Sequence, residues 1–323
     1  MAQRGIDRRL FGVLLASGAV FARGARSAII DLDQDITRLA PPGGPAGRPY
    51  SPPTTLSTVA DIYSRMTAPV RVNGAGPFPF VVDTGANQSV VSGELVAQLG
   101  LSDGPPSPLN GVAGVDIAPT TKASLAFGGW QTPEATLAVL PQAAIGGPGM
   151  LGLDRLEGDQ LTLDFKGQAL RIDSGRRILD QSRDMKVLAH RRNGQLILVD
   201  VDIAGIPLTA FLDSGAQNTI GNLALRSLAI NRHPSNVWLS TPIVSATGQT
   251  ISAEMAELPH LRIGGMSLPN WPVAFADLHT FRMWDLIDKP AILIGVDLLS
   301  RFESVCLDFA RNEVRFRRPD QSI

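Results

Sequence analysis

Short runs of alternating apolar and polar residues recur along most of this chain and are separated by turn residues. Alternation with a period of two is typical of a strand with one buried face. It occurs at residues 122–127, 160–165, 195–203 and 313–317. Short helices are predicted only at residues 92–99 and 222–229. With 24 Pro and 32 Gly to form turns, the pattern predicts a mainly β protein.

One stretch of this pattern occurs twice. Residues 80–86 read FVVDTGA, and residues 210–216 read AFLDSGA. In each copy an apolar strand leads into an Asp and a tight Gly turn, and a second apolar run follows. The Asp-Ser/Thr-Gly triplet alone is weak evidence, because a chain of this length contains one by chance roughly one time in five.

Further landmarks flank both copies in the same order, which makes the repeat strong. The first pair of landmarks is the hairpin glycines, Gly74 and Gly205. The second is a glycine that follows apolar residues, Gly152 and Gly295, and the third is the sequence Leu-Asp-Phe, at 163–165 and 307–309. Repeated landmarks in one order indicate an internal duplication. At 323 residues the chain is long enough for two lobes of ordinary domain size.

Two copies of one Asp-bearing half predict a two-lobed protein with a pseudo-twofold axis. Such an axis can bring Asp83 and Asp213 together although they are 130 residues apart in sequence. Two carboxyls in contact cannot both ionise cheaply, so the pair holds one proton over a range of pH. The ionised member can act as general base on a water while the other polarises a carbonyl, which suits peptide hydrolysis without a covalent intermediate.

These residues resemble the retropepsin-like aspartic proteases, with two retropepsin-type halves fused in one chain. The resemblance covers residues 60–318. Retropepsins carry Asp-Thr-Gly-Ala or Asp-Ser-Gly-Ala, whereas pepsins usually have Ser where Ala86 and Ala216 stand. Both tyrosines precede the first motif, so the flap Tyr of pepsins has no counterpart. The resemblance implies two tandem acid-protease β-barrel lobes related by the axis, with the active site between them.

The same resemblance implies a role for each residue of the two loops. Asp83 and Asp213 are the expected catalytic pair. The expected supporting residues are Thr84, Gly85, Ser214 and Gly215. The two hydroxyls should hydrogen-bond across the lobe interface, and the two glycines should allow a sharp turn that a Cβ would obstruct.

A mobile flap from each half is also implied, placed between the Asp loop and the later glycine. Residues 111–115 and 245–249 fit this position, with Gly114 and Gly248 as candidate substrate-binding residues. Glycine-containing hairpin tips suit a lid that opens and closes.

The expected organisation has five segments. They are an export signal at 1–28, a Pro/Gly-rich tether at 29–59, the N-terminal lobe at 60–173, a linker at 174–186 and the C-terminal lobe at 187–318.

The N-terminal segment indicates export, most simply to a bacterial periplasm. Arg8 and Arg9 precede an apolar stretch at residues 10–22, which is short for a membrane span. The pair resembles a twin-arginine signal; a Sec signal or an uncleaved anchor is the alternative. Removal of residues 1–27 takes away five Arg and one Asp, so the formal net charge falls from −1 to −5. An acidic surface argues against nucleic acid as a partner.

Other candidate chemistry is thin. Cys306 stands in a strand-like run and is expected to be a buried small hydrophobe. The histidines, His190, His233, His260 and His279, lack metal-ligand spacing. The glycine-rich stretch at 146–149 lacks the Lys-Ser/Thr of a phosphate loop and is interpreted as a turn. Neither a metal nor an organic cofactor is expected.

Two further features have structural interpretations beside functional ones. The segment 281–284, within the longer second half, is expected either to wall the cleft or to pack on its own lobe. The repeated aspartates after the Asp loops are expected to work in turns or caps. These are Asp154, Asp164, Asp297 and Asp308.

Three functions from different classes fit the sequence to different degrees. The prediction is an aspartic endopeptidase, complete as a monomer, that takes an extended peptide or protein substrate, compatible with envelope or membrane-associated targets. A non-catalytic peptide-binding module that retains the cleft is the alternative. A two-carboxylate glycosidase fits least, because it leaves the identical turns unexplained and aromatic residues make up only 6% of the chain.

Overall fold

Strands dominate the structure, a computed structural model, and the prediction of a mainly β protein is confirmed. The structure describes residues 14–16, 54–156, 160–173, 184–192, 195–198, 200–232 and 237–319. The expected tether up to residue 53, most of the export signal, the linker at 174–183 and His233 lie outside these ranges.

The N-terminal lobe is built on one sheet with the strand order β3-β4-β5-β10-β6-β9-β8-β7. Its strands are β3 (Val59–Ala60), β4 (Met66–Val72), β5 (Ala75–Val82), β6 (Val90–Ser92), β7 (Asp103–Gly111), β8 (Gly114–Phe127), β9 (Trp130–Leu140) and β10 (Gly149–Leu151). Two short helices accompany it, α2 (Gly93–Leu99) and α3 (Gln142–Ile145).

The C-terminal lobe contains the sheet order β19-β20-β23-β18-β24-β17-β14 and a smaller sheet, β16-β15-β21-β22. The strands of the larger order are β14 (Gln195–Leu198), β17 (Thr209–Leu212), β18 (Ile220–Gly221), β19 (Leu239–Ser245), β20 (Thr250–Leu258), β23 (Trp271–Phe275) and β24 (Ala291–Ile294). The smaller sheet holds β15 (Val201–Ile203), β16 (Ile206–Pro207), β21 (Leu261–Ile263) and β22 (Met266–Leu268). The helices are α4 (Leu223–Arg232), α5 (His279–Met283) and α6 (Val296–Leu299).

The two lobes repeat one pattern of strand pairing around their Asp loops. In the N-terminal lobe, β10 pairs in parallel with β5 and antiparallel with β6, and β6 pairs in parallel with β9. In the C-terminal lobe, β24 pairs in the same way with β17 and β18, and β18 with β23. The duplication seen in the sequence therefore extends to the topology.

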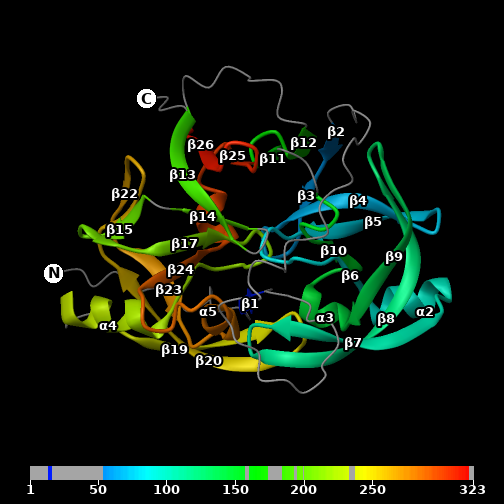
Figure 1. Ribbon diagram of the computed structural model, residues 1–323, viewed down its shortest axis with the longest axis horizontal. Helices are drawn as coiled ribbons and strands as arrows, with labels where there is room; N and C mark the ends of the chain where they lie inside the picture. Colours follow the sequence, from blue (N-terminus) through cyan, green and yellow to red (C-terminus); the bar gives the residue numbers. More distant parts are fainter. Residues whose placement is uncertain are drawn as a thin grey trace, which may run out of the picture.

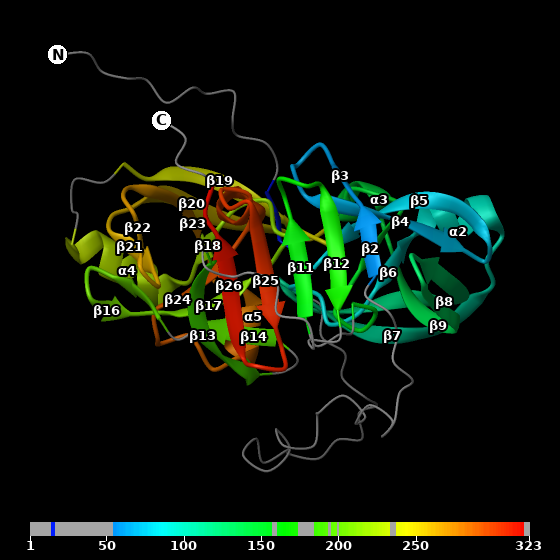
Figure 2. The same ribbon diagram turned by 90° about the horizontal axis from the view of Figure 1, so that it is seen from above.

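A third set of strands joins the lobes. Beyond β14 the large sheet continues in the order β13-β26-β25-β11-β12-β2. Its members are β2 (Thr54–Ser57), β11 (Gln160–Asp164), β12 (Ala169–Asp173), β13 (Asp184–Arg192), β25 (Ser304–Asp308) and β26 (Glu313–Arg317). Figure 2 shows them between the two lobes, where β11 of the first half pairs antiparallel with β25 of the second. We call this set the interlobe sheet.

The structure differs from the expected segment boundaries at two places, and it has one strand within the expected export signal. β2 lies inside the expected tether, because Thr54 and Leu56 alternate with exposed neighbours and pair with the edge of β12. β13 begins at Asp184, so the last residues of the expected linker belong to the interlobe sheet. A short strand, β1 (Leu14–Ala16), pairs in parallel with β19, within the expected export signal.

Local sequence explains the predicted helices and hairpins, which are confirmed. Helix α2 begins after Ser92, whose side chain accepts a hydrogen bond from Leu95 N (3.0 Å), and ends at Gly100 with φ 62°. Helix α4 covers the other predicted stretch. Gly74 and Gly205 have φ of 80° and 82° in two-residue hairpin turns, which require positive φ.

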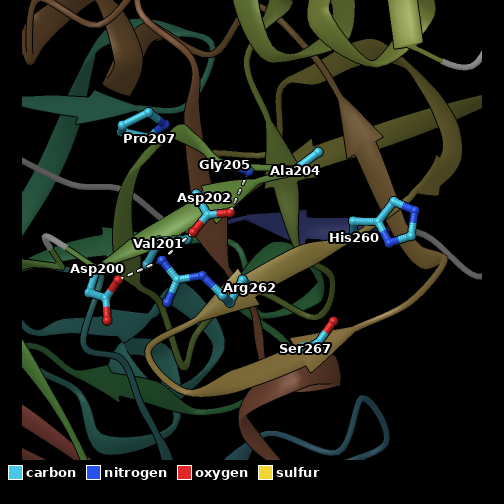
Figure 3. A pocket seen from close by; sticks show the side chains of 9 residues that line it. All are labelled: Asp200, Val201, Asp202, Ala204, Gly205, Pro207, His260, Arg262 and Ser267. Carbon is cyan, nitrogen blue, oxygen red and sulfur yellow. Dashed lines mark hydrogen bonds and ion pairs between the residues drawn. The ribbon is translucent and has the colours of Figure 1, made fainter.

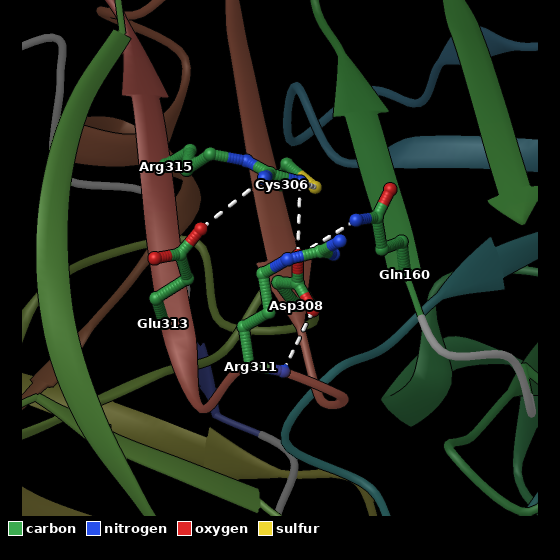
Figure 4. A network of polar contacts seen from close by, with 6 residues as sticks. All are labelled: Gln160, Cys306, Asp308, Arg311, Glu313 and Arg315. Atoms are coloured by element: carbon green, nitrogen blue, oxygen red, sulfur yellow. Dashed lines mark hydrogen bonds and ion pairs between the residues drawn. The ribbon is translucent and has the colours of Figure 1, made fainter. Parts of the chain in front are cut away.

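A buried ionic network fixes the interlobe sheet (Figure 4). The fully buried Asp308 accepts hydrogen bonds from Gln160 of the first half (2.7 Å) and from Arg311 (2.9 Å). Arg315 lies 3.2 Å from the same carboxylate and donates to the buried Cys306 Sγ. Because a buried carboxylate needs matched donors, this network ties β11 to β25 at a defined register.

Candidate active site

The two Asp loops begin at the ends of two equivalent strands. Asp83 directly follows β5 and Asp213 directly follows β17. Each backbone N–H continues the parallel ladder, from Asp83 to Leu151 O and from Asp213 to Ile294 O, both at 2.9 Å. The strands therefore deliver both aspartates from the cores of their lobes to the interface.

Each aspartate is held by its own loop in the same way. Asp83 Oδ1 accepts hydrogen bonds from Gly85 N (2.8 Å) and Ala86 N (3.0 Å). Asp213 Oδ1 accepts them from Gly215 N (2.9 Å) and from the N–H of the following Ala (3.0 Å). Among the described residues, no other group donates to either Oδ2 atom. The Oδ2 atoms are thus the ones available to share a proton or to act on a bound reactant.

The hydroxyls of the loops hydrogen-bond across the lobe interface, as the resemblance implies. Thr84 N donates to Ser214 Oγ (3.1 Å), and Ser214 N donates to Thr84 Oγ1 (3.0 Å). The hydroxyls in turn donate to Leu212 O (3.1 Å) and Val82 O (2.8 Å) of the opposite strands. Four reciprocal bonds in a buried site, each stabilising by about 1 kcal/mol, hold the loops against each other.

The two glycines make room for the opposite carboxyl group. A Cβ at Gly85 would overlap the carboxyl of Asp213, and a Cβ at Gly215 would overlap that of Asp83. Steric space for the partner's carboxyl, rather than positive φ, is therefore what excludes a side chain at these positions. The structure brings together all six residues of the two loops that the sequence singled out.

Burial raises the pKa of both aspartates, and the neighbouring carboxylate adds to the rise only at Asp213. Neither side chain is exposed to solvent. Burial is the largest cause for Asp83, whose pKa is raised to about 6 even though the interaction with the Asp213 carboxyl and the hydrogen bonds from Gly85 N and Ala86 N favour the ionised form. Burial also raises the pKa of Asp213, and the charge of Asp83 raises it further. Two neighbouring carboxyls with raised pKa values can hold a single proton between them.

Two of the repeated aspartates hydrogen-bond to the segments that follow the Asp loops. Asp154 accepts hydrogen bonds from Ser89 N and Oγ (both 2.8 Å), and Ser89 Oγ accepts one from Gly152 N (3.0 Å). In the second half, Asp297 and Thr219 (2.8 Å) repeat this arrangement. Asp164 and Asp308 instead accept backbone N–H bonds in turns, as expected.

The tips of two hairpins reach across the interface and bury apolar side chains in the opposite lobe. Figure 1 shows β7 and the β19–β20 hairpin on the side of the molecule away from the interlobe sheet. Val112, between β7 and β8, lies in a C-terminal cluster with Ala216 and Phe281. Ala246, between β19 and β20, lies in an N-terminal cluster with Val90. We call this arrangement the flap-tip exchange.

The hairpin tips also line a narrow cavity beside Asp83. Residues 109–111 and 246–247 face the Asp loop across it. Gly114 and Gly248 stand in the turns with φ of 146° and 86°, and each has open space around its Cα. The side chains at 112 and 246 make the cross-lobe contacts, which the glycine-based reasoning missed. An apolar residue beside a hairpin glycine is the sequence signal by which they could have been found.

The segment 281–284 packs on its own lobe and also receives a flap tip. Phe281 and Trp284 are almost fully buried against Phe211, with ring centroids 5.9 and 4.8 Å away. At the start of α5, His279 N donates to Val112 O (2.7 Å). The expectation that this segment packs on its own lobe is thus confirmed, and its residues are not among those that line the cavity beside Asp83.

A wide pocket elsewhere does not share the chemistry of the Asp loops. It lies on the smaller sheet of the C-terminal lobe (Figure 3). Arg262 there is ion-paired with both Asp200 (2.8 Å) and Asp202, so its principal charges are already matched. We therefore place the candidate site at the dyad.

Other chemistry is limited in the part of the chain that the structure describes. No three His, Cys, Asp or Glu side chains gather there in a group suited to a metal ion. Within the same ranges, none of the helices combines the length and apolar character of a membrane span. Cys306 is free and buried, as predicted, and burial raises the pKa of its thiol.

Comparison with known families covers both halves of the chain. Residues 68–158 match a family described as gag-polyprotein putative aspartyl protease, and residues 199–298 match one described as aspartyl protease. A search of curated proteins finds no match. Each matched range contains one of the two Asp loops. The chain carries two aspartyl protease domains in tandem, in keeping with fused retropepsin-like repeats, and is an aspartic-type peptidase.

Proposed function

We propose that Asp83 and Asp213 form the catalytic dyad of an aspartic endopeptidase that cleaves extended peptide segments of exported or envelope proteins. The observation that carries this proposal is the reciprocal contact between each carboxyl and the glycine of the opposite loop. Both Oδ2 atoms lie at the interface and have no hydrogen-bond partner among the described residues. The pKa of both aspartates is raised.

The mechanism follows from one shared proton. The ionised carboxyl accepts a proton from a water, and that water attacks the scissile carbonyl carbon. The protonated carboxyl donates its proton to the carbonyl oxygen, which gives a neutral tetrahedral diol. The carboxyl that took the proton of the water then passes it to the amide nitrogen. A hydroxyl of the diol returns its proton to the other carboxyl as the C–N bond breaks, which restores the one-proton pair. The substrate is expected to lie extended between dyad and flaps, bonded through its backbone as an added strand.

The closeness of the carboxyls disfavours a glycosidase. The carboxyls of Asp83 and Asp213 lie close enough for each to affect the pKa of the other, and each lies against the glycine of the opposite loop. Glycosidases hold their carboxyls at least about 5 Å apart, so that a sugar carbon or a water fits between them.

Cleavage of a diverse peptide library between about pH 3 and 7 tests the proposal. Wild type should cleave, and Asp213→Asn should not, because a neutral amide cannot complete the one-proton dyad. Matching unfolding curves would show that both proteins are folded. Folded wild type that binds peptides without cleaving them would support the alternative, a non-catalytic peptide-binding module.

Export to a periplasm is a further part of the proposal, supported by the twin arginines and the apolar stretch that follows them. Cell fractionation of the full chain and N-terminal sequencing of the product test it. We expect a periplasmic protein shortened near residue 28. A full-length cytoplasmic product would contradict export, and a full-length membrane-bound one would indicate an anchor.

A further inference from the structure

A completely buried arginine lies beside the dyad and was not identified from the sequence. Arg65, just before β4, has no solvent exposure. Its Nε donates to Asp61 Oδ2 (2.7 Å) and its Nη2 to Ile145 O (3.0 Å). Its Nη1 crosses the interface to Gly215 O (3.3 Å), in the Asp loop of the other lobe. A buried guanidinium with each nitrogen engaged is expensive to desolvate, which suggests a role beyond packing.

The second half makes the matching contact with an uncharged side chain. Gln195 stands 18 residues before Asp213, as Arg65 stands 18 residues before Asp83. Its Nε2 donates to Gly85 O at 2.7 Å, and the residue is buried. In each lobe, one buried side chain therefore donates a hydrogen bond to the glycine carbonyl of the opposite Asp loop. The duplication preserved the contact but placed a positive charge on one side only.

The positive charge of Arg65 is a difference between two Asp loops whose hydrogen bonds are otherwise equivalent. Its field favours the ionised form of Asp83, which offsets part of the rise in the pKa of Asp83 that burial causes. Behind the guanidinium lie its ion-pair partner Asp61 (2.6 Å) and the ring of Tyr63 (5.2 Å). The other acidic groups near the loops are Asp213 itself and two of the repeated aspartates, Asp154 and Asp297.

Building on the proposed function, we propose that Arg65 and Gln195 are positioning residues that clamp the two Asp loops together. We further propose that the single charge of Arg65 makes Asp83 the carboxylate of the resting dyad. In this assignment Asp83 accepts the proton of the water and Asp213 carries the proton donated to the substrate.

The pH dependence of kcat/KM for a peptide found in the library distinguishes this role from a purely structural one. The dyad is active when it holds one proton. The fall of kcat/KM at low pH, the acidic limb of the profile, therefore marks the uptake of a second proton. Loss of the Arg65 charge raises the pKa of that step, so Arg65→Gln should move the acidic limb up by about 1 pH unit. Arg65→Lys should keep the acidic limb in place while lowering kcat. Lysine keeps the positive charge but lacks the several fixed N–H donors of the guanidinium.

Gln195→Leu is the matched control in the other lobe. It removes the equivalent contact without changing charge, so kcat should fall with no movement of the acidic limb. Equal loss of activity at every pH in Arg65→Gln would reduce Arg65 to a structural residue and overturn the charge assignment. Unchanged kcat in Gln195→Leu would overturn the clamp.

A readout without catalysis keeps the inference separate from the proposed function. Carboxyl ¹³C titration, with signals assigned by Asp83→Asn and Asp213→Asn, should show Asp83 ionising first in wild type. Its pKa should rise in Arg65→Gln by the same interval as the acidic limb. If wild type proves inactive, the proposed function fails, yet this titration still decides the assignment: unaltered signals in Arg65→Gln would reject it.

Discussion

Gly85 and Gly215 matter because each leaves space for the carboxyl of the opposite lobe. Gly85→Ala should therefore destabilise the protein by about 1–3 kcal/mol, the usual cost of overpacking, and should abolish cleavage by displacing Asp213. Gly93→Ala is the control, since a Cβ there meets only Val139 at 3.7 Å and lies in a helix. The control should be neutral or stabilising by up to about 1 kcal/mol in urea unfolding. An equally stable Gly85→Ala would contradict the packing described.

The protonation of the dyad should appear in the stability of the protein. A carboxyl with a raised folded-state pKa lets the folded chain hold its proton longer than the unfolded chain. Stability consequently falls as pH rises from the unfolded pKa near 4 through the folded pKa. Asp213→Asn imitates the protonated member at every pH and removes this loss.

We expect Asp213→Asn to match wild type in unfolding free energy near pH 4. It should exceed wild type by at least about 1 kcal/mol at pH 7, since one pKa unit corresponds to about 1.4 kcal/mol. Denaturant unfolding at both pH values measures the difference. A variant that is less stable than wild type at pH 7 would show that the pair is not strained by its charge.

At the scale of elements, the tip of the β7–β8 hairpin contacts the C-terminal lobe through the Val112 side chain and through the hydrogen bond from His279 N to Val112 O. Val112→Ser should release the tip from its cluster, and amide hydrogen exchange in the hairpin should quicken at least about tenfold, the equivalent of 1.4 kcal/mol. Val115→Ser, in the same hairpin but 57% exposed, is the control and should change little. Equal exchange in both variants would rule out the flap-tip exchange as a latch.

Local sequence predicted those elements whose structure depends on neighbouring residues. The strands leading to Asp83 and Asp213, the capped helix α2 and the Gly74 hairpin follow from alternation, caps and turn glycines. Contacts between distant segments left no such signal. The strand β2 was interpreted as tether because its partner β12 is more than 100 residues away.

Arg65 shows why part of the site could not be predicted. Its 18-residue spacing to Asp83 is repeated by Gln195, but an arginine and a glutamine share no obvious chemistry in a sequence comparison. Only their common acceptors, the two glycine carbonyls, reveal the equivalence. The meeting of the two Asp loops was predictable because the same residue types recur in both halves.

At the scale of the whole molecule, the interlobe sheet sets how the lobes face each other. Asp308→Ala should remove one of the two carboxylates that pair with the buried Arg315, leaving Glu313, and should cost about 3 kcal/mol of unfolding free energy. The repeat-equivalent control is Asp164→Ala, whose ion pair with the half-exposed Arg171 should contribute no more than about 1 kcal/mol. Comparable losses in the two variants would show that the buried network is not what joins the lobes.

The central claim is that one chain supplies both carboxyls of a single peptidase site. Its most direct test compares peptide cleavage by wild type, Asp83→Ala, Asp213→Ala and an equal mixture of the two variants. The contacts of Thr84 and Ser214 lie within one chain, so wild type should cleave as a monomer, and both variants and their mixture should be inactive. Restored cleavage in the mixture would mean that the site assembles between chains, and it would contradict the account.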